Sequence, residues 1–134
     1  LLVAAPAAAA DCKGTLYLTI DTGSMSQADL IARTLAKHGV KATFFLANEK
    51  TVNGDRSLEP AWGAYWQARV AEGHAFGSHT WDHGYFRGDL PGGKVRYVVA
   101  GKVQELDAAG VCGELRRSEQ RFRELTGRGY DRIW

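Results

Sequence analysis

Short apolar runs alternate along the chain with segments in which apolar residues recur every three or four positions. Thr15–Asp21 is apolar, rich in strand-forming residues and followed by Gly23, which predicts a buried strand. Val40–Leu46 is a second continuous apolar run, and His74–Ser78 is a shorter third one. Continuous apolar strands are typical of a parallel sheet that helices cover on both faces.

Helices are predicted between and after these runs, over residues 26–39, 60–73 and 114–126. In the first of them, Ser26 and Asp29 resemble a capping box, with Asp in place of the usual Glu or Gln. A glycine closes or follows each of the three segments, and glycine is a common helix end.

Aromatic residues lie on one side of the second predicted helix, at Trp62, Tyr65 and Trp66. Such a stripe can form a platform on which sugar rings stack. At helical spacing, however, we expect these side chains to pack in the core.

The pattern is less distinct towards the end of the chain. Residues 85–93 hold three glycines and one proline and predict a loop. Residues 94–113 fit either a helix or a strand, and we favour a helix. Ile133–Trp134 is expected to begin a fourth strand.

Alternating strands and helices predict a parallel α/β architecture. In such folds the functional groups come from the loops that follow the carboxyl ends of the strands. Polar residues that can carry chemistry stand at two of these ends. Asp21 and Thr22 follow the first strand, and the segment 79–83 follows the third.

Composition and charge narrow the class of protein. A chain of 134 residues with 45% hydrophobic and 24% charged residues is long enough for one globular domain, and is neither disordered nor fibrous. The net charge of +2 does not indicate nucleic-acid binding. The arginines of 116–123 alternate with glutamates at helical spacing, which is typical of a solvated helix face. No protein partner is implied.

The first residues resemble the end of a secretory signal peptide. Leu1–Ala10 is apolar, and its alanines form an A-x-A cleavage site before Asp11. Ten apolar residues are too few to span a bilayer, which takes about 20. We therefore expect an exported protein in the periplasm, the cell envelope or the extracellular space. Cys12 and Cys112 then either form a disulfide or remain two separate thiols.

Two of the four histidines lie close together, at His79 and His83. Histidines four apart on a helical turn share one face, so both imidazoles can bind one divalent ion. Two surface histidines on a loop are the alternative interpretation. Asp82 lies between them and is expected to point away, as a surface residue or a residue behind the ligands.

Three segments together resemble one known family. Leu18–Gly23 is similar to the Thr-Phe-Asp-Asp-Gly motif of polysaccharide deacetylases with a NodB homology domain. Gly39–Phe45 resembles the second-strand signature of that family, and Gly73–His83 resembles its His-Ser/Thr-x-x-His motif. The three matches occur in the family's order, and residues 11–134 are expected to be part of such a domain.

The resemblance implies a distorted (β/α) barrel and a single divalent metal, usually zinc. It implies that His79 and His83 are metal ligands and that Asp21 is the general base. The expected reaction is hydrolysis of N-acetyl groups on an N-acetylated polysaccharide such as peptidoglycan, chitin or poly-N-acetylglucosamine. In that reaction the metal activates a water molecule while the base takes its proton. A related amidohydrolase acting on a non-sugar amide is an alternative.

One residue departs from the family motif. The second Asp of the motif is a metal ligand in the family, and here that position is Thr22, whose neutral hydroxyl is a weaker ligand. Asp21 can move onto the metal, the histidines can hold it weakly with waters, or the site can bind none. The last case predicts a glycan-binding pseudoenzyme.

The resemblance covers only the first part of the family domain. The Arg-x-Pro, later Asp and Leu-x-His motifs of the family would lie beyond Trp134. We therefore expect the N-terminal part of a barrel, truncated before it closes. Such a chain leaves a sheet edge uncovered, and by itself is expected to fold poorly and to be inactive.

Overall fold

The computed structural model describes residues 13–133, which form a mixed α/β structure with two small sheets. The first sheet is parallel, with the order β1 (Thr19–Asp21), β2 (Thr43–Leu46) and β3 (Ala75–Ser78). All three predicted strands are therefore confirmed, although each is shorter than its apolar run. Their parallel register brings the carboxyl ends of the strands to one edge.

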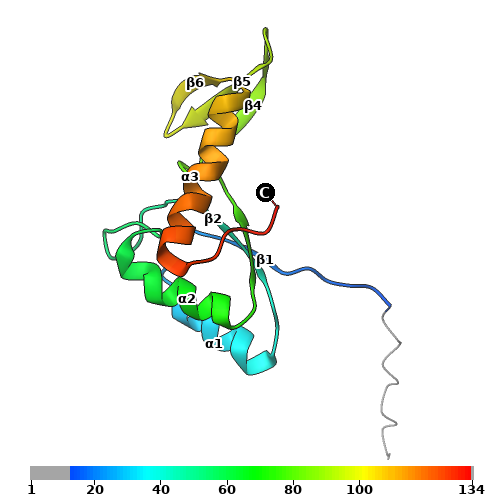
Figure 1. Cartoon of the computed structure of the whole chain (residues 1–134), viewed down its shortest axis with the longest axis vertical. Helices are drawn as coiled ribbons and strands as arrows, with labels where there is room; N and C mark the ends of the chain where they lie inside the picture. The colour runs from blue at the N-terminus through cyan, green and yellow to red at the C-terminus, as the bar shows by residue number, and fades with distance from the viewer. Residues whose placement is uncertain (1–12, 134) are drawn as a thin grey trace, which may run out of the picture.

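Three α-helices and one short 3-10 helix accompany this sheet: α1 (Ala28–His38), η1 (Pro60–Trp62), α2 (Gly63–Ala71) and α3 (Ala108–Thr126). Figure 1 shows α1, α2 and α3 gathered around the sheet. The predicted end of the first helix is confirmed, because Gly39 adopts the left-handed conformation. The predicted capping box is wrong. Gln27 occupies the cap position, and the Ser26 hydroxyl lies 3.1 Å from that of Ser24 instead.

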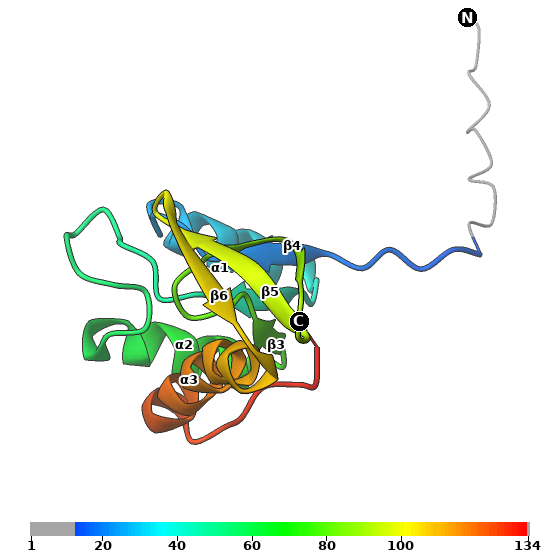
Figure 2. The same ribbon diagram turned by 90° about the horizontal axis from the view of Figure 1, so that it is seen from above.

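The second sheet is antiparallel and consists of β4 (Tyr85–Leu90), β5 (Lys94–Val99) and β6 (Lys102–Leu106). Figures 1 and 2 place it beside the amino-terminal end of α3. The loop expected at 85–93 is therefore wrong, and the helix favoured at 94–113 is wrong except over 108–113, which belongs to α3 (Ala108–Thr126). Tight turns explain the difference, because Ala100 and Gly101 both have positive φ and form a two-residue hairpin connection.

The core lies between the parallel sheet and the helices and is largely aromatic. The Phe76 ring stacks on Phe44 and lies 4.6 Å, between centroids, from Phe122 of α3. Trp66 is fully buried and donates from its indole to the carbonyl of Ser57 at 2.7 Å. Trp62 and Tyr65 pack against the same cluster. The expectation that this aromatic stripe belongs to the core is confirmed.

The last described residues run beside β3 without forming a strand. The backbone of Asp131 donates to Phe76 at 2.8 Å, and that of Ser78 donates to Ile133 at 3.2 Å. The fourth strand expected at 133–134 is therefore not seen up to Ile133, and Trp134 lies outside the described residues. Within 13–133 the strands form no closed barrel. The truncated barrel stays a prediction.

Two predictions concern residues that the structure leaves undescribed. The signal-peptide end at 1–10 lies outside the described residues. So does Cys12, and with it the predicted pairing with Cys112. None of the helices in residues 13–133 is long and apolar enough to cross a membrane.

Candidate active site

The candidate site lies at the edge where the three parallel strands end. Asp21 is the last residue of β1, and His79 follows β3 directly. Their side chains meet there, with Nε2 of His79 3.7 Å from Oδ2 of Asp21. The Asp21 side chain is 57% exposed, so its carboxylate is open to water and to a substrate. The structure thus brings together two of the residues singled out in the sequence.

The second histidine lies next to the first. The rings of His79 and His83 are 4.7 Å apart between centroids, with an angle of 42° between their planes. The predicted helical turn is wrong, because residues 79–84 are irregular. Thr80 and His83 instead adopt left-handed backbone conformations, with φ of 64° and 51°. Each costs a non-glycine residue about 1–2 kcal/mol, so surrounding contacts must hold this segment in place.

Backbone and side-chain hydrogen bonds anchor the histidine segment on both sides. His79 donates from its backbone to Leu46 at 3.0 Å, and Asn48 donates to Trp81 at 2.9 Å. On the other side, Glu114 of α3 accepts from the backbone of Asp82 at 3.1 Å. Asp82 itself is exposed, as expected for a residue that points away from the histidines. The segment is therefore held between the end of β2 and the side of α3.

The Thr22 side chain connects two neighbouring segments at this edge by hydrogen bonds. Its hydroxyl accepts a hydrogen bond from the backbone of Ala47 at 2.9 Å and donates one to the Ala47 carbonyl at 3.2 Å. The side chain is buried. Both bonds join the end of β1 to the segment after β2. A hydroxyl engaged in this way makes a poor replacement for a carboxylate ligand.

Sequence reasoning missed one residue of the site, Glu49. Its Oε1 lies 2.8 Å from Nδ1 of His83, and its side chain is only 17% exposed. Its other carboxylate oxygen is buried and has no hydrogen-bond partner among the described residues. Glu49 follows β2 at the same edge as Asp21 and His79. The strand-end rule that singled out those residues also covers this position.

Donor chemistry decides whether these residues fit a metal ion. No group of three or more His, Cys, Asp or Glu side chains in residues 13–133 surrounds a common metal position. Donors of one tetrahedral zinc lie about 3.3–3.4 Å apart, given bonds of about 2.0–2.1 Å. The 3.7 Å between Asp21 and His79 is close to that spacing. Two imidazoles beside a carboxylate are donors of a type that zinc accepts, but the described side chains do not converge on one position for it.

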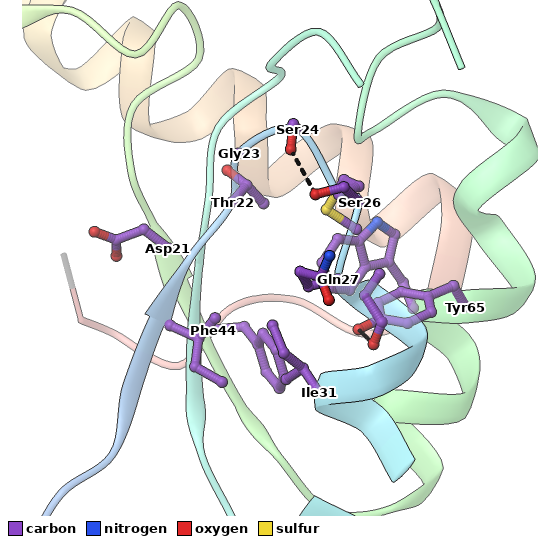
Figure 3. A pocket seen from close by; sticks show the side chains of 13 residues that line it. Asp21, Thr22, Gly23, Ser24, Ser26, Gln27, Ile31, Phe44 and Tyr65 are labelled. Atoms are coloured by element: carbon purple, nitrogen blue, oxygen red, sulfur yellow. Dashed lines mark hydrogen bonds between the residues drawn. The ribbon is translucent and has the colours of Figure 1, made fainter. Parts of the chain in front are cut away.

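A pocket of about 200 Å³ adjoins this edge, with Asp21 and Thr22 in its lining but neither His79 nor His83. Figure 3 shows its lining side chains, among them Ile31, Phe44 and Tyr65, on the helix side of β1. The carboxylate of Asp21 points away from these side chains. The pocket is mainly apolar, and the candidate chemistry lies on the other side of the strand.

Comparison with known proteins places the chain in context. A family model described as "Polysaccharide deacetylase" matches residues 8–133. A chitin deacetylase from Pestalotiopsis sp is 30% identical over 120 residues, which are 85% of this chain and 31% of that protein. A peptidoglycan-N-acetylglucosamine deacetylase from Listeria monocytogenes is 36% identical over 69 residues, 51% of this chain and 13% of the relative. The chain thus spans a third or less of these relatives.

Solved structures of deacetylases also resemble this chain. The chitin deacetylase from the fungal pathogen Colletotrichum lindemuthianum has a TM-score of 0.56 and 25% identity, over 83% of this chain and 40% of that one. A T48 deacetylase solved with substrate also has a TM-score of 0.56, over 85% of this chain and 45% of the other. At 24% identity the second likeness shows the fold alone.

Proposed function

Because the chain belongs to the polysaccharide deacetylase family, we propose that the protein hydrolyses N-acetyl groups on an N-acetylated polysaccharide of the peptidoglycan, chitin or poly-N-acetylglucosamine class. The reaction adds water across the amide bond. The bond between the carbonyl carbon and the nitrogen breaks, acetate leaves, and a free amine remains on the sugar. The family match and the named activities of the relatives support this proposal.

The observation that carries the proposal is the meeting of Asp21 and His79 at the open edge of the parallel sheet, with the His83 ring beside them. Asp21 is placed to accept the proton of an attacking water, because its carboxylate is exposed and faces the histidines. We assign it as the general base. Positioned carboxylates of this kind typically contribute a factor of about 10²–10⁴ to the rate.

A divalent metal belongs to the proposal. We assign its ligands as His79 and His83, and zinc as the ion that suits two imidazoles. When bound, such an ion would polarise the amide carbonyl and lower the pKa of a water molecule. Thr22 contributes no charge, which leaves Asp21 and Glu49 as the carboxylates beside the two histidines.

A second candidate function is a glycan-binding protein without metal. The bonds of the Thr22 hydroxyl to Ala47 favour it, because they occupy the position where the family motif has a carboxylate ligand. The substitution Thr22→Asp separates the two candidates. Activity found only in the Thr22→Asp variant would support the glycan-binding protein. Activity in the natural protein that His79→Ala abolishes would exclude it.

The direct test is acetate release from N-acetylglucosamine oligomers, with chelator and then with added zinc. We expect release that the chelator stops and zinc restores. Asp21→Asn should lower the rate about 10²–10⁴-fold while the protein stays folded. His38→Ala is the matched control for His79→Ala, because His38 is exposed at the far end of α1. No release from folded protein on several glycans would contradict the deacetylase.

The site of action is a further part of the proposal. We propose that the protein works outside the cytoplasm, on glycan of the envelope or the surroundings. The apolar stretch 1–10 with its A-x-A sequence supports this. Fractionation of cells that produce the protein, with sequencing of its mature amino terminus, checks both the location and the cleavage before Asp11.

A further inference from the structure

We propose that Tyr85 and Arg87 form a binding position for the sugar that neighbours the reacting sugar in an N-acetylated polysaccharide. The Tyr85 ring stacks on the apolar face of that neighbouring sugar, and the Arg87 guanidinium donates hydrogen bonds to its hydroxyl or amide oxygens. The choice of ligand rests on the function proposed above. The binding position itself requires no metal ion and no particular protonation of the histidines.

The place of Tyr85 beside the candidate site carries the first step. Tyr85 begins β4, and its ring lies 6.0 Å from that of His83 between centroids, with 38° between the planes. The His83 ring is in turn 4.7 Å from that of His79, which lies beside Asp21. Three rings thus follow one another from Asp21 onto the antiparallel sheet. A polysaccharide with one unit at Asp21 must continue across the neighbouring surface, and this succession of rings offers it one path.

Packing within the protein does not account for an aromatic side chain at position 85. The Phe86 ring lies 5.0 Å from that of buried Tyr97, its partner in the register, so these two side chains share the inner face of the sheet. Successive side chains of a strand point to opposite faces, which places Tyr85 on the outer face, where it is 54% exposed. Its own partner is Val98, which pairs with Val103, 64% exposed. An exposed aromatic side chain continued by apolar neighbours is typical of a binding surface.

Arg87 adds hydrogen-bond donors to this aromatic side chain. Its guanidinium carbon lies 4.7 Å from the centroid of the Tyr85 ring, and the residue is exposed. A register shift between Phe86 and Gly88 leaves Arg87 as the extra residue of β4, without a partner on β5. Such bulges occur often next to active sites, where they direct a side chain. The bulge thus leaves Arg87 at the Tyr85 ring with no cross-strand neighbour opposite it.

The chemistry of the two side chains fits a sugar ring. Such a ring presents C–H groups on its faces and hydroxyl groups at its edge, so it needs an apolar plane and hydrogen-bond donors side by side. Tyrosine supplies a rigid plane at a low cost in conformational entropy, and a guanidinium supplies five N–H donors. Figure 1 shows the antiparallel sheet at the end of the molecule away from α1 and α2, so these helices do not cover its outer face.

The first experiment measures acetate release from N-acetylglucosamine oligomers of increasing length. Tyr85→Ala should raise KM for the longer oligomers about tenfold, the effect of losing one stacking contact, and leave that for the shortest within about twofold. Arg87→Ala should act in the same direction, whereas Tyr85→Trp should keep most of the affinity. Tyr17→Ala is the matched control, because Tyr17 is 81% exposed before the start of β1 and should leave every KM unchanged. An equal effect of Tyr85→Ala on all lengths, or none, would overturn the proposal.

The second experiment measures binding without catalysis. Isothermal titration calorimetry follows the longest oligomer as it binds to Asp21→Asn and to the double variant that also carries Tyr85→Ala. The double variant should bind about tenfold more weakly. Equal affinities would contradict a binding position at Tyr85. Circular dichroism of each variant shows that it is folded.

The two experiments together separate the binding position from the proposed function. Oligomer binding that depends on Tyr85, without acetate release by the natural protein, would remove the hydrolysis and keep the binding position. Acetate release to which Tyr85 makes no difference would do the reverse, and neither binding nor release would contradict both. A dimer of the natural protein that Tyr85→Ala dissociates would show that a second copy covers this face, and would overturn the proposal.

Discussion

The phenolic oxygen of Tyr97 accepts a hydrogen bond of 3.0 Å from the backbone of Gly84, the residue that follows His83. Tyr97 lies on the middle strand of the antiparallel sheet, is 1% exposed, and donates to the Glu114 carboxylate at 2.8 Å. The same oxygen lies 3.1 Å from the hydroxyl of Thr80. The second sheet therefore supports the histidine segment through the buried side chain of Tyr97.

A side chain at position 84 should disrupt this support. A Cβ on Gly84 would lie 2.2 Å from the Tyr97 ring, so Gly84→Ala forces the ring or the histidine segment to move. We expect a loss of about 1–3 kcal/mol in the free energy of unfolding, measured in urea. Gly113→Ala is the control, because nothing lies near its Cβ position in α3, and it should gain about 0.5–1 kcal/mol. An unchanged stability of Gly84→Ala would contradict the packing described.

Removing the Tyr97 hydroxyl should have a related effect without a steric clash. Tyr97→Phe leaves the backbone N–H of Gly84 without this acceptor and removes one of the two donors to Oε2 of Glu114, while Asp82 stays as the other. The expected loss is about 1–3 kcal/mol in the free energy of unfolding. Tyr17→Phe, at a site 81% exposed, should change it by less than about 0.5 kcal/mol. Equal effects of the two substitutions would show that the Tyr97 contacts add little.

The sequence predicts the parallel sheet of the fold but not the antiparallel sheet. The parallel strands were predictable because Val40–Leu46 and its neighbours are continuous apolar runs, and Gly39 marks a helix end. The antiparallel sheet was not, since Val95, Val98 and Val99 suit a helix as well as a strand. Its second hairpin places Ala100 at positive φ, where asparagine or glycine would have given a clearer signal.

Thr22 should matter for stability whatever its role in chemistry. Thr22→Val keeps the shape but removes both bonds to Ala47. We expect a loss of about 1–3 kcal/mol, because the backbone N–H of Ala47 is left unpaired, whereas its carbonyl still accepts from the Ser57 hydroxyl. Thr34→Val is the matched control, since the Thr34 hydroxyl makes its bond to Leu30 on the exposed face of α1. If urea unfolding shows the same small change for both variants, the hydrogen bonds between Thr22 and Ala47 add little to the stability of the protein.

The buried His74 should make the protein less stable in mild acid. Burial lowers the pKa of His74, against the raising effect of Glu72 and with help from Lys41 and Arg69. Its Nδ1 also accepts from the backbone of Ala42 at 3.1 Å, which requires the unprotonated atom. The folded state thus binds a proton less readily than the unfolded state. The contribution of His74 to the free energy of unfolding is therefore complete above a pH of about 6.5 and decreases as the pH drops below it.

Thermal unfolding between pH 7.5 and pH 5 checks this expectation. The melting temperature of the natural protein should fall across this range. His74→Gln keeps an acceptor for Ala42 but cannot take up the proton, so its melting temperature should fall less. His38→Gln, altered at an exposed position, is the control and should follow the natural protein. If the melting temperature of His74→Gln fell as much as that of the natural protein, a group other than His74 would cause the acid sensitivity.

The candidate site was predictable in its residues but not in its geometry. Asp21, His79 and His83 stand out by motif and by their place after strands. The helical turn expected for the histidines fails, because two left-handed residues and the inserted sheet shape this segment. Glu49 escaped notice because its partner is 34 positions away in the chain, and only the paired strands bring the two together.

The left-handed backbone at Thr80 and His83 has a consequence for protein engineering. Glycine at either position would relieve strain, so a library selected for heat resistance alone would tend to accept it. At position 83 that choice would discard an imidazole while the melting temperature rose. A stabilisation programme should therefore keep both residues fixed and seek its gains in α3, where exposed Gly113 offers one at no risk to the histidines.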